Sequence, residues 1–143
     1  MATITSFEDL EIWKKAQDLA AMVYSLCDVN QKIAKDFSFK DQIKRAALSI
    51  SNNIAEGFEY NNNADFHRFL RISKGSCGEV RNCLLFSIKI NYCTTEEVHE
   101  PLELSKSLGK QIGAMMKYLQ KKIIEKKLAA KINKPAKPAT PNP

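Results

Sequence analysis

Two histidines, four cysteines and, among ten glutamates, Glu56 and Glu79 are the candidates of this sequence for catalysis or metal binding. His67 and His99 have no partner at HxxxH or HExxH spacing, and no glycine-rich phosphate loop occurs. Glu56 and Glu79 could converge inside a helical bundle, but bundle metal sites add a Glu-x-x-His pair from each of two further helices, and this sequence has one such pair, Glu96 with His99. Structural hydrogen bonding is therefore the favoured role of these carboxylates, with Asn52, Asn53 or Arg45 as partners.

The cysteines lead to the same interpretation. Cys27, Cys77, Cys83 and Cys93 lie at irregular spacings without a CxxC pair and fall mainly inside apolar patterns. Metal sites need clustered ligands, so we expect reduced and packed thiols. With no nucleophile, ligand set or cofactor loop, the sequence predicts a protein that is not an enzyme and that holds no metal or cofactor.

One polar stretch still needs an explanation. Residues 49–58 read SISNNIAEGF, which places two serines and two adjacent asparagines within a helical pattern. Such side chains compete with the helix for its own hydrogen bonds. They form either a reactive or binding site or a set of polar groups buried in a tight helix contact.

Four helices are predicted from the apolar pattern and from four capping signals. Apolar residues recur at steps of three and four over residues 7–28, 39–56, 63–91 and 95–128, and no segment alternates with a period of two. The predicted N-terminal capping pairs are Ser6 with Asp9, Ser38 with Asp41, Asn62 with Asp65, and Thr94 with Glu97. We expect an all-α, antiparallel, up-and-down four-helix bundle.

Two residues mark expected interruptions of these helices. Gly57 is predicted to supply the left-handed stop of the second helix. Pro101 predicts a kink or a restart in the fourth helix, because proline lacks an amide donor. The bundle domain is assigned to residues 1–128, and residues 129–143, rich in Lys, Ala and Pro, are assigned to a disordered, extended tail.

Charge is distributed unevenly along the chain. The formal net charge is +6, yet residues 117–143 alone carry eight lysines and one glutamate, a net charge of +7. The lysines assigned to nucleic-acid binding in this part are Lys121, Lys122, Lys126 and Lys127. They can attract nucleic acid without reading its sequence, although solubility alone would also account for them.

The third helix carries the basic face of the predicted bundle. At 100° per residue, its cations fall within a sector of about 140°, away from the apolar stripe. These cations are Arg68, Arg71, Lys74 and Arg81. Such a face can follow a phosphate backbone, and a solvated helix face is the alternative. No set of aromatic residues is interleaved with the C-terminal lysines, so stacking on single-stranded bases has little support.

The second helix has a further stripe away from its core face. Leu48, Ser51 and Ala55 recur there at steps of three and four, and their small or apolar side chains predict a subunit contact. The longest apolar run has six residues, from Leu19 to Tyr24, so no membrane span is expected. The N-terminus lacks a signal-peptide pattern, and the predicted location is the cytoplasm.

Three blocks of the sequence resemble a known family. DQIKRAALSISNNIAEGF and DFHRFLRISKGSCGEV, preceded by FEDLEIWKKA, closely resemble the four-helix-bundle proteins encoded in intervening sequences of large-subunit (23S) ribosomal RNA genes, over about residues 7–122. Accessory variability proteins of diversity-generating retroelements are similar in fold. The near-neutral charge of residues 1–116 departs from the basic surface of the retroelement branch and favours the intervening-sequence branch.

The resemblance implies a homopentameric ring of four-helix protomers, and a reverse transcriptase as partner if the retroelement branch applies. The motif positions assigned here to structure are Arg45, Ser49, Asn53, Glu56, Gly57, Gly75, Ser76 and Glu79. Ser49, Asn53 and Glu56 are predicted to meet the third helix opposite Gly75 and Ser76, in a polar network that fixes register.

The expected function is non-enzymatic binding of RNA or DNA by charge, without base readout. The alternative is a structural or protein-binding scaffold, including an accessory subunit of a reverse transcriptase.

Overall fold

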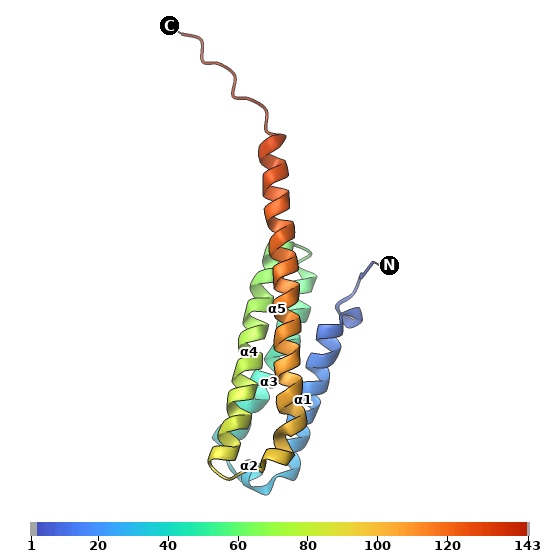
Figure 1. Cartoon of the computed structure of the whole chain (residues 1–143), viewed down its shortest axis with the longest axis vertical. Helices are drawn as coiled ribbons and strands as arrows, with labels where there is room; N and C mark the ends of the chain where they lie inside the picture. The colour runs from blue at the N-terminus through green and yellow to red at the C-terminus, as the bar shows by residue number, and fades with distance from the viewer. Residues whose placement is uncertain (1–2, 143) are drawn as a thin grey trace.

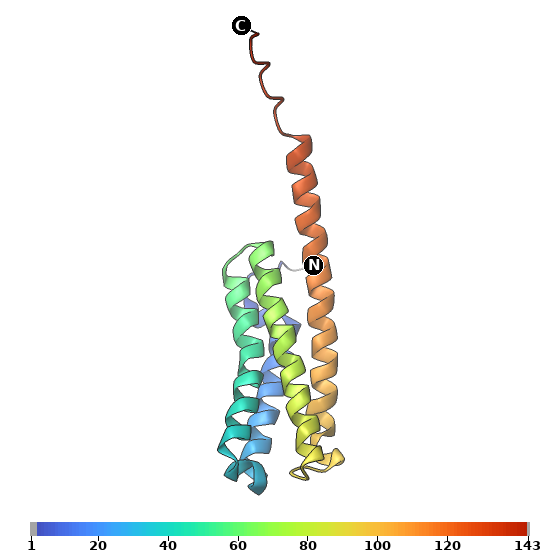
Figure 2. The same ribbon diagram turned by 90° about the vertical axis from the view of Figure 1, so that its left-hand side faces the viewer.

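Four long helices run antiparallel along a common axis in the computed structural model of this chain, which describes residues 3–142 (Figures 1 and 2). They are α1 (Glu11–Val29), α3 (Phe37–Glu59), α4 (Asn63–Lys89) and α5 (Thr95–Ile132). A 3-10 turn, η1 (Phe7–Asp9), precedes α1, and a short helix, α2 (Gln31–Lys35), joins α1 to α3. Residues 3–142 contain no strand, and the predicted all-α fold is confirmed.

The core follows from the apolar stripes of the four long helices. α3 packs most extensively on α4, and α4 on α5, while α1 contacts both α3 and α5. Burying one aliphatic side chain contributes about 1.5–3 kcal/mol relative to leaving it exposed. The largest fully buried side chains include Leu19, Val23, Ile43, Ile50, Ile54, Leu70, Val80, Leu84, Leu108 and Ile112.

Two of the four predicted caps are confirmed. The Asn62 side chain accepts a hydrogen bond from the Asp65 amide at 3.0 Å, which begins α4. Thr94 and Glu97 form a complete capping box at the start of α5, because each side chain accepts from the other residue's backbone amide. Both sites combine a capping acceptor with a helix start that the apolar pattern also indicates.

The other two predicted caps are wrong. Ser6 precedes the turn η1 and makes no side-chain capping hydrogen bond, and α1 begins later, at Glu11. Ser38 lies inside the first turn of α3, because Asp36 caps this helix. The apolar pattern did not predict the short helix α2. This helix ends at Lys35, so Asp36 is the one residue between α2 and α3.

The Asp36 carboxylate links the start of α3 to the connection between α4 and α5. Its Oδ1 accepts from the Phe39 amide at 3.0 Å, and its Oδ2 accepts from the Tyr92 hydroxyl at 2.8 Å. Both hydrogen bonds favour the charged form, with the backbone bond the larger effect, so the pKa of Asp36 lies below its ordinary value of 3.8.

We therefore expect Asp36→Asn to change how stability depends on pH. A lowered pKa in the folded state adds stability above pH 3.8, and this stability is lost as the pH falls through the folded-state pKa. The wild type should be more stable than Asp36→Asn near neutral pH, and the difference should shrink below about pH 4. Urea unfolding followed by circular dichroism across this range measures it. A difference that stays constant with pH would contradict the assignment.

Gly57 does not stop α3. The helix continues to Glu59, no described glycine has a positive φ, and the left-handed residue after the helix is Asn61, with φ 51°. Gly57 is buried, and a Cβ built on it would lie 2.6 Å from the Cβ of Phe69. The predicted stop is wrong because this glycine allows close approach of α3 to α4.

Helix α5 passes Pro101 without a break, so a restart of the helix at this residue is wrong. It ends at Ile132, four residues later than the sequence indicated, and residues 134–142 have no regular secondary structure. Figures 1 and 2 show α5 extending well past the ends of the other helices. We call residues 120–132 the α5 arm; all its residues but Ile123 are exposed. None of the described helices combines the length and hydropathy needed to cross a bilayer.

Candidate functional site

A groove with a volume of about 910 Å³ lies between α4 and α5. Five cationic side chains line it, Lys74 and Arg81 from α4 and Lys106, Lys110 and Lys117 from α5. No carboxylate is among the fourteen residues that line the groove. The groove is therefore a concave surface of one charge sign, which attracts anions.

The helical periodicity of α5 places its three groove lysines on one face. Lys106, Lys110 and Lys117 are separated by four and seven residues, which brings them to the same side of the helix. Their rise along the axis is about 16 Å at 1.5 Å per residue. Lys74 and Arg81, seven residues apart on α4, form the opposite rim in the same way.

Little of this charge is neutralised within the chain. Lys106 donates to Glu103 at 3.2 Å, but both side chains are exposed, and such pairs contribute little. The other four groove cations have no ion-pair partner in the part of the chain that the structure describes. Their ammonium and guanidinium groups are available to an anionic ligand.

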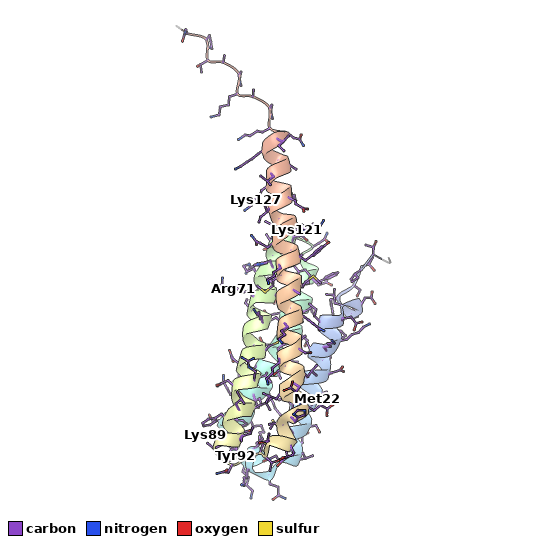
Figure 3. All side chains as sticks on the ribbon, viewed as in Figure 1. Met22, Arg71, Lys89, Tyr92, Lys121 and Lys127 are labelled. Atoms are coloured by element: carbon purple, nitrogen blue, oxygen red, sulfur yellow. The ribbon has the colours of Figure 1, made fainter. Side chains whose placement is uncertain are left out.

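Only two of the four cations of the predicted basic face of α4 line the groove. Lys74 and Arg81 line the groove, whereas Arg68 pairs with Asp65 at 3.4 Å and lies 4.6 Å from the ring centroid of Phe69. Arg71 is exposed and projects away from α4 on the outer side of the bundle (Figure 3).

The sequence reasoning missed Lys106, Lys110 and Lys117. The signal that could have found them is the set of small residues that runs through the same segment, Ser105, Gly109 and Gly113, at steps of four. Small side chains on one helix face leave space beside it, and lysines next to that face then border the space. Only the rotation of α5 relative to α4 shows that the small residues and the lysines of α5 border the same groove.

The predicted arm lysines are all exposed, but they are not equivalent. Lys122 pairs with Glu125 at 3.6 Å, and its ammonium lies 5.7 Å from the ring centroid of Tyr118. Lys121 and Lys127 project from the upper part of α5 (Figure 3). Lys126 is also exposed.

Two serines of α4 donate hydrogen bonds to the polar stretch of α3. The Ser76 hydroxyl donates to Ser49 Oγ at 3.0 Å, and the buried Ser73 hydroxyl donates to the Ile50 carbonyl at 2.7 Å. Asn53 donates to the Ser49 carbonyl and hydroxyl, at 2.7 and 2.9 Å, inside its own helix. The polar contact between α3 and α4 is present, with Ser49 and Ser76 in it as expected and Ser73 in addition.

Other motif positions do not take part in this contact. Glu56, Glu79 and Gly75 are exposed, and nothing lies within 4 Å of a Cβ built on Gly75, so its predicted place opposite the network is wrong. Arg45 is exposed too and pairs with Asp41 at 2.9 Å. The buried apolar stripes of α3 and α4 lie on other faces of these helices, so these residues lie on the outer faces.

The three residues of the predicted subunit stripe also differ in their exposure. Leu48 is 42% exposed and Ala55 is half-buried, but Ser51 is only 1% exposed. Ser51 accepts a hydrogen bond from the Gln17 side chain of α1 at 3.1 Å. Its assignment to an outer subunit contact is wrong, because it faces α1 within the same protomer.

The cysteines carry free thiols. Burial raises the pKa of Cys77, which lies at the groove, to about 12, and it also raises the pKa of Cys27, Cys83 and Cys93. A thiol with a raised pKa stays protonated at neutral pH and is a poor nucleophile. Across residues 3–142, no group of three His, Cys, Asp or Glu side chains lies close enough to hold a metal ion.

The fold and the groove define the class of this molecule as an all-α bundle protein with a cationic groove between its last two helices. The chain belongs to the family of 23S rRNA-intervening sequence proteins, whose family model matches residues 8–114. The family membership predicted from the three sequence blocks is confirmed. Lys117 and the α5 arm lie beyond the matched residues.

A solved structure is similar to this fold. It is the crystal structure of a protein of unknown function from the S23 ribosomal protein family of Bacteroides thetaiotaomicron, with a TM-score of 0.69 and 25% sequence identity. The similarity covers 74% of this chain and 98% of that chain. A comparison with curated proteins found no match.

Proposed function

We propose that this protein binds nucleic acid through the phosphate backbone and does not read bases. The observation that supports the proposal is the groove between α4 and α5, where five cations surround one hollow with no carboxylate among its lining residues. Cations that neutralise phosphates release condensed counterions, which favours binding at low salt. Four of the five cations are lysines, which act as point charges on phosphate.

We also propose that the protein self-associates in the cytoplasm. The exposed Leu48 and the half-buried Ala55 on α3 support a subunit contact, because an apolar side chain exposed beside a small one lets another helix approach. A pentameric ring and a reverse-transcriptase partner stay predictions of the resemblance.

The salt dependence of nucleic-acid binding tests the function. Fluorescence anisotropy of the full chain with labelled RNA and DNA, at salt concentrations from about 50 to 300 mM, should give a slope of log K against log salt near −4, from five phosphate contacts. Light scattering of the same samples gives the mass of the assembly. An assembly that binds no nucleic acid at any of these salt concentrations would overturn the proposal and favour a protein-binding scaffold.

A further inference from the structure

We infer that the nucleic acid is a double helix and that it lies along one face of α5, from the groove onto the arm. This inference rests on the proposed function and adds the form of the ligand and its direction on the protein. Three observations carry it: the row of lysines along α5, the scarcity of stacking surfaces beside that row, and the glycines of the groove.

The lysine row is straight and long, and the exposed Ile124 and Leu128 lie on the same face between its last two members. At 100° per residue, its members lie within a sector of about 80°, and they span about 38 Å along the helix axis. The members are Lys106, Lys110, Lys117, Lys121 and Lys131. Helix α5 is continuous over the whole row and projects beyond the bundle (Figure 2). One turn of a nucleic-acid duplex is about 34–36 Å long, so the row matches slightly more than one turn.

The stiffness of a nucleic-acid duplex also agrees with a straight row of lysines. A duplex has a persistence length of about 50 nm and is straight on the scale of the row, so it can follow the lysines without bending. A flexible single strand has to be held extended, and proteins do this by stacking its bases on aromatic rings.

Stacking surfaces are few on this face. His67 is the one ring-bearing side chain that lines the groove, and no Phe, Tyr or Trp lines it. Tyr118 is the single Phe, Tyr or Trp residue of α5, and the ammonium of Lys122 lies over its ring. A surface that offers five cations and a single imidazole ring suits a ligand whose bases are already stacked on one another.

The glycines of the groove are not explained by helix packing. A Cβ on Gly78 would meet nothing within 4 Å, and on Gly109 and Gly113 it would make ordinary contacts at 3.9 and 3.6 Å. Each helical glycine costs about 0.5–1 kcal/mol relative to alanine. Alanine would fit and be more stable, and we assign the space beside these groove glycines to one phosphate backbone of the duplex.

The direct test compares a duplex of about 24 base pairs with single strands of the same length and sequence, as RNA and as DNA, by anisotropy at low salt. We expect the full chain to bind the duplex at least about tenfold more tightly. Equal affinity or a preference for single strands would overturn the duplex while leaving the proposed function in place. Failure to bind either form would overturn the proposed function itself.

A groove-filling variant tests the location. Gly113→Leu puts a side chain into the hollow where the backbone has room, and we expect it to reduce duplex affinity at least about tenfold without loss of thermal stability. Gly75→Leu is the matched control, because Gly75 is an exposed helical glycine outside the groove. Unchanged duplex affinity of Gly113→Leu, with a folded protein by circular dichroism, would place the ligand elsewhere.

Discussion

Neutralising four groove cations together is expected to weaken nucleic-acid binding at least about 100-fold near 50 mM salt and to make the salt slope shallower by about three. The variant carries glutamine at Lys74, Arg81, Lys110 and Lys117. The physical reason is counterion release, because each lost phosphate contact removes close to one released cation. These four side chains are exposed and have no ion-pair partner in the described chain, so their loss should leave folding intact.

A control of equal charge separates the groove from the net charge of the protein. It carries glutamine at Lys14, Lys15, Lys35 and Lys89, none of which lines the groove. Figure 3 shows Lys89 at the end of the bundle opposite to Lys121. We expect this control to keep most of the affinity. Equal losses in both variants, measured by anisotropy at the same salt, would show that net charge alone attracts the nucleic acid.

Gly57→Ala is expected to lower the free energy of unfolding by about 1–2 kcal/mol. Overpacking a tight contact costs about 1–3 kcal/mol, whereas alanine gains up to about 1 kcal/mol over glycine inside a helix. The new Cβ would lie 2.6 Å from the Cβ of Phe69 and 3.3 Å from Cδ1 of Phe66. A Cβ is fixed to the backbone and cannot rotate away, so α3 and α4 have to move apart.

Gly75→Ala is the matched control for this experiment. Gly75 also lies in a helix, but it is exposed, and a Cβ there meets nothing within 4 Å. We expect it to raise the free energy of unfolding by about 0.5–1 kcal/mol. Urea unfolding of both variants gives the comparison. If Gly57→Ala proved as stable as Gly75→Ala, the close helix contact would be an incorrect account of this glycine.

The sequence by itself determined the four long helices, two of their caps and the family. The period of the apolar residues identified the buried faces, because helical periodicity is a local property of the chain. Asn62 and Thr94 were predictable as caps for the same reason, since a cap depends on residues within one turn. Even so, the helix starts at Glu11 and Phe37 differ from the predicted ones, because the turn η1 precedes α1 and Asp36 caps α3.

Only the tertiary structure decided how the polar faces combine. Lys74 and Lys110 are far apart in the sequence, and they become opposite rims of one groove because α4 packs directly on α5. Gly57 and Gly75 look alike as helical glycines, and only the approach of Phe69 makes the first one necessary. A local pattern specifies which residues of a helix are buried. The partner that each remaining residue contacts depends on the rotation of one helix relative to another, and the side chains of both helices determine that rotation.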